Sequence, residues 1–393
     1  MNYKYTLSML AVGVLMAACS NELPDSPQTD DSTYINFGVP TTTVVNSRAT
    51  ETLPEGVKQG STLLNSIAPN TSFGVLGCCL AYQPGTQDLD YTSGTSPWSV
   101  KRPNINLDVF NEQKVDYDGT NCKYTYTDNA PRKWYSTVDG IPESDIDLCQ
   151  YTFFSYYPYK SFEVLTRKYQ LKEGTTVDIP DIPAPIFKYS MPFDSNDLNT
   201  KLDQSTVKDV MLDAIYNTKK GSKVQFDFTH MLTALSFTVN NYSNNIPLTV
   251  YKIELSGEFW KSITVDLTQA SASYSFEDSY KGSFVIYDST TGMSIPYNDS
   301  NFKPAFADQY MLLISGQNTG LGYLGNAKVS ITYKFGDGAE KTESFGRPAT
   351  FVPRPGTMYQ AQLNFVGNAF VLQFVTANND YWENGSDSNL TFQ

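Results

Sequence analysis

The sequence predicts an all-β protein. Short runs that alternate between apolar and polar residues, or that are apolar throughout, recur between turn-forming residues along most of the 393-residue chain. Aromatic residues, which favour strands, are abundant, with 27 Tyr, 23 Phe and 4 Trp. Stretches with a helical period are scarce, and strands without long helices between them favour β-sandwiches over parallel α/β sheets.

The expected strands are short and follow one another closely. They are residues 34–39, 72–82, 150–157, 223–229, 234–239, 248–255, 283–287, 309–315, 327–335, 359–366 and 370–376. Residues 53–67 and 206–216 are the best candidates for short helices. Residues 178–197 contain four prolines, so we expect an extended surface loop there.

The length suggests two to three domains, at roughly 150 residues each. A polar segment with one glycine, residues 217–223, separates two patterned halves. We therefore expect a signal peptide at 1–18, an acidic tether at 19–33, one β-sandwich domain at 34–217 and a second at 223–393.

The N-terminus has the pattern of an export signal. Lys4 precedes an apolar stretch that ends at Ala18, which is too short for a transmembrane helix of about 20 residues. Small residues then precede Cys19, as in a bacterial lipobox, so we expect palmitate or a related lipid on Cys19. The alternative is an ordinary signal peptide with a chance cysteine. The acidic residues after Cys19 resemble the surface-export signal of some Gram-negative outer-membrane lipoproteins.

The composition argues against several kinds of chemistry. The net charge of −13 disfavours nucleic-acid binding, and a single histidine excludes multi-histidine zinc sites. His230 falls on an apolar strand face, so we expect it to be buried with a hydrogen-bond partner rather than catalytic. No carboxylate pair or CxxC motif stands out. We therefore expect no enzyme activity, no cofactor and no metal site.

Cysteines and tyrosines leave two questions open. Cys78 and Cys79 should point to opposite faces of one strand, and small core residues are a simpler reading than a disulfide with Cys122 or Cys149. The tyrosine-rich runs at 124–126 and 156–159 could stack on sugars, although such runs more often pack in cores. One function that these tyrosines permit is that of a glycan-binding outer-membrane lipoprotein in a polysaccharide uptake system. We keep it as the alternative to the function that the family resemblance below implies.

Several segments carry a family resemblance in the same order along the chain. They are FGVLG at 73–77, LCQYTFFSYYP at 148–158, DVMLDA at 209–214, VQFDFTHMLTALSFTV at 224–239, YMLLI at 310–314, PGTMYQAQLN at 355–364 and WENGSDSNLTF at 382–392. Together they resemble the fimbrillin-like lipoproteins, the subunits of bacterial type V pili. Ser315 stands where this family usually has proline, which leaves the subfamily open.

The resemblance implies a fold and a mode of assembly. It implies two tandem Greek-key β-sandwiches of the transthyretin/Ig-like type, in a structural, tip or anchor component of a fimbria with a role in adhesion. In the family, a surface protease cuts an outer-membrane lipoprotein precursor after an arginine and releases the first strand. A strand from another subunit then fills the exposed groove. A host protein or glycan would be the adhesion partner.

The residues permit this assembly. Ile35, Phe37 and Val39 share one parity, so a strand there can bury them on one face. The next basic residue, Arg48, lies in a polar segment suited to cleavage by an arginine-specific protease, the alternative being a plain surface arginine. Two C-terminal segments could donate a strand, and their inward residues are Phe370, Leu372 and Phe374, or Leu390 and Phe392.

Overall fold

The computed structural model confirms the all-β class. It describes residues 33–42, 55–58, 61, 64, 66–80, 107–126, 130–136, 143–167, 182–192, 203–243, 246–268, 272–297, 310–315, 327–346 and 353–376. Within these ranges the helical content is two short 3-10 segments, Glu143–Leu148 and Gln204–Thr206. Greek-key connectivity stays a prediction.

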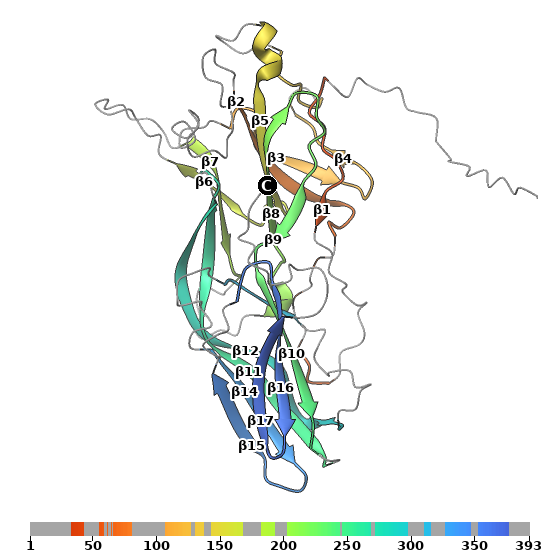
Figure 1. Cartoon of the computed structure of the whole chain (residues 1–393), viewed down its shortest axis with the longest axis vertical. Coiled ribbons are helices and arrows are strands. Elements are labelled where there is room, and N and C mark those ends of the chain that lie inside the picture. The colour runs from red at the N-terminus through yellow and green to blue at the C-terminus, as the bar shows by residue number, and fades with distance from the viewer. Residues whose placement is uncertain are drawn as a thin grey trace, which may run out of the picture.

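One sheet of seven strands forms the upper part of the elongated molecule (Figure 1). In order across the sheet these are β1 (Thr41–Thr42), β9 (Asp227–His230), β8 (Met211–Lys219), β5 (Gln150–Tyr157), β2 (Thr71–Leu80), β3 (Phe110–Tyr117) and β4 (Cys122–Lys123). Residues 33–42 enter this sheet through β1, and we call them the N-terminal segment.

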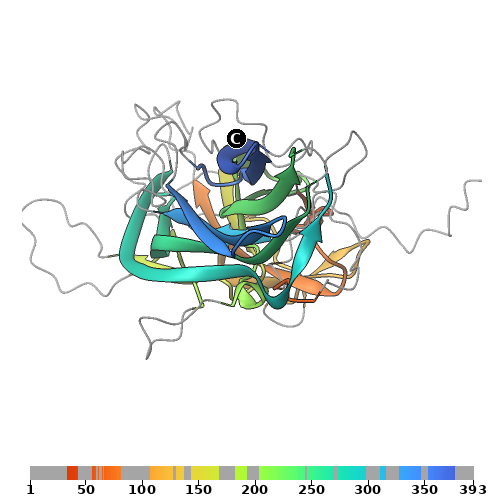
Figure 2. The ribbon, with the colours of Figure 1, turned by 90° about the horizontal axis from the view of Figure 1, so that it is seen from below.

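Two further sheets make up the lower part, and we call them the two lower sheets, although β6 and β7 of the second reach up beside the seven-stranded sheet (Figure 1). Figure 2 shows the molecule from below. The first contains β13 (Tyr310–Leu313), β10 (Thr233–Asn241), β16 (Met358–Val366) and β17 (Ala369–Thr376). The second contains β15 (Lys341–Gly346), β14 (Lys328–Phe335), β11 (Leu248–Asp266), β7 (Ile182–Ser190) and β6 (Glu163–Arg167), and β12 (Ser273–Ile295) pairs with β11.

Strand β11 links the two parts of the molecule. Its residues 248–256 pair with β14, and its residues 262–266 pair with β7 from the first half of the chain. The expected boundary at 217–223 coincides with the turn between β8 and β9, which both belong to the seven-stranded sheet. The division into two tandem domains stays a prediction.

Two apolar cores lie on opposite faces of the seven-stranded sheet. Along β2, Leu76 and Cys78 face what we call the first core, which continues between the two lower sheets. Phe73 and Val75 face the second core, on the other side of the sheet. Burial on both faces explains why β2 and β5 read as continuous apolar runs rather than as alternating patterns.

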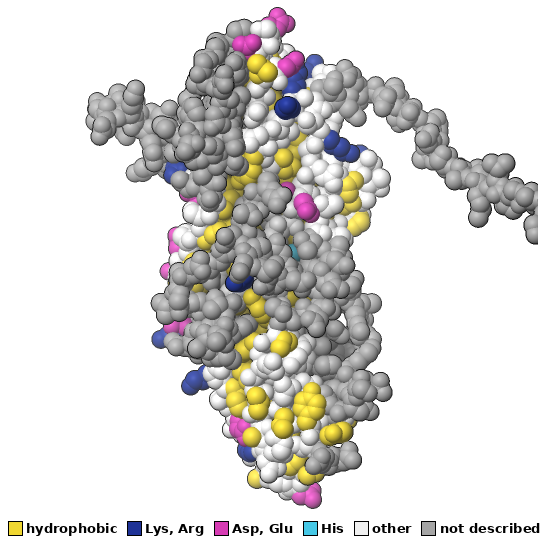
Figure 3. Space-filling view, viewed as in Figure 1, with side chains coloured by type: hydrophobic (Ala, Val, Ile, Leu, Met, Phe, Trp, Pro, Cys, Tyr) yellow, Lys and Arg dark blue, Asp and Glu magenta, His cyan; other side chains and the backbone are white. Residues whose placement is uncertain are grey.

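Large hydrophobic side chains are exposed at the lower end of the molecule, where Figure 3 shows them on the surface. Tyr242 and Ile246 lie between β10 and β11, Tyr297 lies just after β12, and Val366 ends β16. Tyr242 N donates to Phe365 O, which places the first of these loops beside the turn after β16. This end of the lower sheets therefore presents apolar side chains to solvent.

Both expected helices are wrong where the structure describes them. Residues 211–219 form β8, which pairs with β5 and β9 and buries Met211 in the second core and Leu212 in the first. A strand buried on both faces carries an apolar run that periodicity alone cannot distinguish from a helix. In 53–67 the described residues include a turn at 55–56 and isolated bridges from Val57 to β12 and from Ser61 to β13.

The expected surface loop at 178–197 is also wrong, because β7 occupies residues 182–190 and buries Phe187 completely. Pro183 pairs only with β6. The residues paired with β11 begin at Ile186, and beyond them Leu267 N donates to Pro185 O at 3.0 Å. This contact uses the proline carbonyl and needs no N–H from Pro185, so the strand tolerates the proline.

Candidate functional site

The N-terminal segment lies along the β9 end of the seven-stranded sheet. β1 pairs in parallel with β9, and Phe37 forms a parallel bridge with Val224 just before β9. Gly38 N donates to Val224 O at 2.7 Å, and Thr41 N donates to Phe226 O at 2.9 Å. The segment therefore continues the sheet beyond β9.

On its other side the segment pairs with residues 132–134. Ile35 N donates to Arg132 O at 2.8 Å, and Trp134 N donates to Thr33 O at 3.1 Å. The local bridge is antiparallel. The segment thus fills a space between two walls, and we call this space with its walls and floor the strand site.

The wall at 132–134 is held by side chains. The Arg132 guanidinium lies over the rings of Tyr126 and Tyr135, at 4.6 and 5.3 Å from Cζ to the ring centroids. Its Nη2 donates to Asp108 O at 2.8 Å. Cation–π contacts and a charged hydrogen bond therefore fix a wall that no named strand provides.

The floor of the strand site is aromatic. Ile35 is fully buried, and Phe37 is 6% exposed. Burying such a side chain is worth about 1.5–3 kcal/mol. Five rings surround Phe37, with centroid distances of 5.3 Å to Tyr124, 5.8 Å to Phe110, 6.0 Å to Phe226, 6.2 Å to Phe73 and 6.4 Å to Phe153.

Val39 does not share the buried face of Ile35 and Phe37. It is 39% exposed, whereas Pro40 and Thr42 are buried. The segment passes from the antiparallel wall to the parallel one earlier, between Ile35 and Asn36, and the alternation of side chains breaks only after Gly38. The sequence expectation is therefore confirmed for the burial of Ile35 and Phe37 and wrong for Val39.

Cys122, at the β4 end of the sheet, touches the segment directly. Its thiol donates to Gly38 O at 3.2 Å. Burial raises the pKa of the Cys122 thiol to about 11, and the nearby charge of Asp118 adds to this. Both ends of the seven-stranded sheet thus meet at the N-terminal segment, and the half-buried Cys122 thiol would lose this contact if the segment left.

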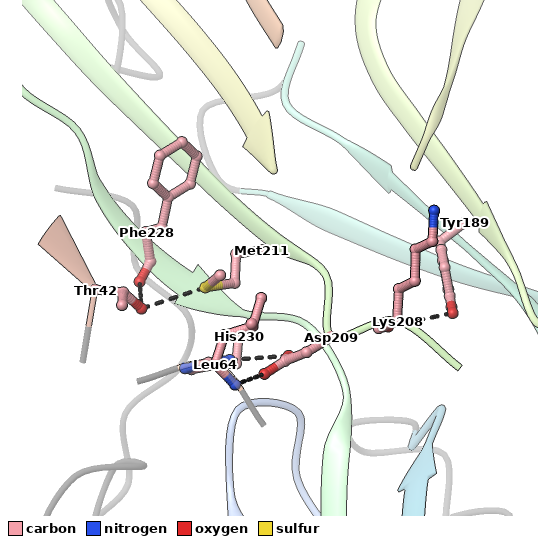
Figure 4. A network of polar contacts seen from close by, with 8 residues as sticks. All are labelled: Thr42, Leu64, Tyr189, Lys208, Asp209, Met211, Phe228 and His230. Carbon is pink, nitrogen blue, oxygen red and sulfur yellow. Dashed lines mark hydrogen bonds and ion pairs between the residues drawn. The ribbon is translucent and has the colours of Figure 1, made fainter. Parts of the chain in front are cut away.

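Figure 4 shows the lower end of the strand site. Thr42 Oγ1 donates to Phe228 O at 3.0 Å. Close by, His230 Nδ1 lies 2.9 Å from Asp209 Oδ1, and Leu64 N donates to Asp209 Oδ2 at 3.0 Å. The expectation that His230 is buried with a hydrogen-bond partner is confirmed.

A second buried carboxyl supports the β9 wall. Asp213 accepts hydrogen bonds from Ala214 N and Asp227 N, each at 2.8 Å. Burial raises its pKa to about 7, against an ordinary value of 3.8. Asp227 Oδ1 in turn accepts a hydrogen bond from Thr41 Oγ1 at 2.9 Å. The protonation of Asp213 is therefore coupled to the strand that holds the segment.

The cysteines and tyrosines behave as packing residues. Cys78 faces the first core and Cys79 packs against the second, as expected for neighbours on a strand, and no disulfide joins Cys78, Cys79, Cys122 or Cys149. Tyr156 and Tyr157 are buried, and Tyr124 and Tyr126 pack against the second core. These tyrosines therefore do not form exposed platforms for sugars.

The part of the chain with described coordinates holds no cluster of three or more His, Cys, Asp or Glu side chains suited to a metal ion. In those same residues we find no helix with the length and hydropathy needed to span a bilayer.

Of the two proposed donor strands, the structure describes one. Phe370, Leu372 and Phe374 lie in β17, which pairs with β16 over eight residue pairs. The Phe370 ring is buried 4.8 Å from Tyr333 and 4.9 Å from Phe365. Cys19, Arg48, Leu390 and Phe392 lie outside the described residues.

The wall at 132–134 is the part of the site that sequence reasoning missed. Residues 130–136 read APRKWYS, with neither strand nor helix periodicity. Their contact with residues 33–35 is made through backbone atoms of a distant segment, and no local pattern signals it. The aromatic floor was visible only as a general excess of Phe and Tyr.

Comparison with known proteins gives structural matches alone. No family model and no curated protein matches the chain. A "putative cell adhesion protein" from Bacteroides ovatus has 14% identity and a TM-score of 0.38, covering 87% of this chain and 96% of that one. Another, from Bacteroides uniformis, has 12% identity and a TM-score of 0.37, covering 89% and 99%.

A fimbrial protein from Bacteroides ovatus matches at 12% identity and a TM-score of 0.29, covering 86% of this chain and 49% of that one. At identities and TM-scores this low, the function of these proteins is not assigned to this chain.

Proposed function

We propose that this protein is a structural subunit, or a tip or anchor component, of a cell-surface fimbria, and that it assembles by donor-strand exchange. The observation that supports this most strongly is the setting of the N-terminal segment. Its side chains Ile35 and Phe37 complete the second core, although the segment is joined to the sheet mainly through an edge and a loop. Such a segment can detach while the other strands stay paired.

Cleavage after Arg48 would separate this segment from the body of the protein. The next described residues are tied down independently. Lys58 N donates to Ile286 O at 3.0 Å, Ser61 N donates to Tyr310 O at 2.8 Å, and Leu64 N is held by Asp209. A cut between these ties and the strand site would therefore free residues 33–42 and leave the remainder anchored.

Departure of the segment would expose the aromatic floor and unpair both walls. Val224 N, for example, would lose its bond to Asn36 O, and Arg132 O would lose its bond from Ile35 N. A strand from another copy would restore the buried area and the hydrogen bonds together. This is the physical basis of assembly in the proposal.

The C-terminal residues Leu390 and Phe392 are the better donor candidate. Their spacing, Leu-Thr-Phe, matches Ile35-Asn-Phe37. The other candidate also has an apolar residue two positions before a phenylalanine, at Leu372 and Phe374, but β17 is already engaged with β16 and with the first core. To donate β17, a subunit would have to break its own lower sheet.

Lipid on Cys19 would hold the precursor at the outer membrane, facing outwards, until an arginine-specific protease releases it. The partners in this proposal are other fimbrial subunits, the protease, and a host protein or glycan bound by the assembled fimbria.

The test is cleavage of purified Ser20–Gln393 with an arginine-specific protease, followed by native gels and electron microscopy. We expect ladders or filaments that the uncut protein lacks. An Arg48→Ala variant treated identically is the matched control, because cuts at other arginines remain possible in it. Monomers after complete cleavage at Arg48 would reject strand exchange, as would filaments from the Arg48→Ala variant.

A further inference from the structure

The backbone of the strand site does not by itself fix the direction of the strand inside it. The N-terminal segment runs antiparallel to residues 132–134 and parallel to residues 224–228. A strand that entered in the opposite direction would also have one parallel and one antiparallel neighbour. Parallel and antiparallel ladders differ little in stability per residue, so main-chain pairing favours neither direction strongly.

The side-chain positions of the site are not equivalent. Position 37 is surrounded by the five rings of Tyr124, Phe110, Phe226, Phe73 and Phe153. Aromatic pairs at such distances are worth about 0.5–1.5 kcal/mol each beyond their buried area.

Position 35 is fully buried around an aliphatic side chain, and its carbonyl accepts a hydrogen bond from Tyr124 OH at 2.7 Å. Position 39 is exposed. The site therefore has one aromatic position, with an aliphatic position two residues before it and no buried position two residues after it.

We propose that this ring cage selects the direction and register of any strand that occupies the site. The selected pattern, read from N- to C-terminus, is an aliphatic residue, any residue and a phenylalanine, with the strand parallel to residues 224–228. Reversal would place phenylalanine at the aliphatic position and an aliphatic side chain among the five rings. If the strand shifted by two residues in either direction, its phenylalanine would lie at position 35 or 39 and no longer among the five rings.

The inference rests on the proposed function for its biological meaning, since only a vacated site receives a second strand. It predicts how the C-terminal candidate would enter. Leu390 would take the place of Ile35 and Phe392 the place of Phe37, in the same direction as the native segment.

The first experiment uses the uncut chain, so its outcome does not depend on strand exchange. In the Ile35→Phe/Phe37→Ile double variant the composition and total hydrophobicity are unchanged, but the phenylalanine is moved out of the cage. Labelling of Cys122 by a thiol reagent, read by peptide mapping, reports segment docking because this thiol bonds to Gly38 O.

We expect the exchange to speed Cys122 labelling by about tenfold or more. Cys78, fully buried in the first core, should stay unlabelled and so confirm that the remaining fold is intact. Unchanged Cys122 labelling would overturn the inference, since general hydrophobicity would then suffice. If Cys78 also becomes labelled, the double variant has lost more than the docking of the segment. The peptide experiment described next then tests the inference.

The second experiment adds peptides to protein cleaved after Arg48. The native peptide TYINFGVPTT should restore protection of Cys122, and the exchanged peptide TYFNIGVPTT should not. Equal protection by both peptides would overturn the inference while leaving strand exchange possible. A Cys122 that stays protected after cleavage without any peptide would instead show that the site does not open, which would reject the proposed function.

Discussion

The most informative single substitution is Phe37→Ala. Phe37 is almost completely buried among five rings, and Phe-to-Ala changes in such positions cost about 3–5 kcal/mol. This loss falls first on docking of the N-terminal segment, because the segment can detach while the sheets stay folded. At 1.4 kcal/mol for each factor of ten, even the smaller value raises the detached population about 100-fold.

Cys122 provides the assay. Cys122 is half-buried while the segment is docked. When the segment detaches, the thiol loses its bond to Gly38 O and becomes more accessible, so its labelling rate rises with the detached population. The full chain is labelled under native conditions, and the modified cysteine is identified by peptide mapping. We expect faster labelling in the variant, up to the limit set by a fully exposed thiol, with the half-buried thiol of the docked state as the baseline.

Val39→Ala is the matched control for this substitution. Val39 lies two residues further along the same segment but is 39% exposed, and changes at such positions usually alter stability by less than about 0.5 kcal/mol. Equal labelling rates in Phe37→Ala and the parent protein would refute the reasoning. Equal acceleration in Phe37→Ala and Val39→Ala would refute it too, because burial at position 37 would then have no special weight.

Three further predictions concern the walls and the buried carboxyls. Because the pKa of Asp213 is raised, the folded state binds its proton more tightly, and the free energy of unfolding should fall by about 1.4 kcal/mol per pH unit between 3.8 and about 7. Urea titrations should show this slope weakened in Asp213→Asn. Arg132→Ala, which removes the side chain that holds the wall at 132–134, should speed Cys122 labelling. Asp209→Ala removes the carboxylate that His230 Nδ1 and Leu64 N contact and should lower the urea midpoint by the equivalent of about 1–3 kcal/mol.

Much of the fold follows from local patterns. The strand expected at 150–157 coincides with β5, and the expected burial of Ile35, Phe37 and His230 is confirmed. These predictions succeeded because alternation, turn residues and apolar runs are properties of the segment itself. The failures at β7 and β8 have a different origin, since the neighbours of a strand decide whether prolines or a two-sided apolar run are acceptable there.

The candidate site was less predictable than the fold. Sequence reasoning found the segment that fills it, but not the wall at 132–134 or the cage around position 37. Both depend on contacts between residues far apart in the sequence, such as Ile35 with Arg132 and Phe37 with Phe226. No periodicity within a window of neighbouring residues records such contacts.

The long strands β11 and β12 illustrate the same limit. The sequence predicted two short strands at 248–255 and 283–287, whereas the structure has continuous strands at 248–266 and 273–295 that pair along most of their length. Polar and charged residues in their outer parts read locally as turns. β11 and β12 pair with each other, and β11 also pairs with β7. This pairing extends the two strands beyond their apolar centres.

The central claim is that the N-terminal segment is a removable strand whose place another copy can fill. The most direct test follows Cys122 labelling and oligomer size together after cleavage at Arg48. The account predicts that Cys122 becomes reactive upon cleavage and is protected again as oligomers form. Cleaved protein that stays monomeric with Cys122 protected would contradict it, because the segment would then remain in its site without its covalent link.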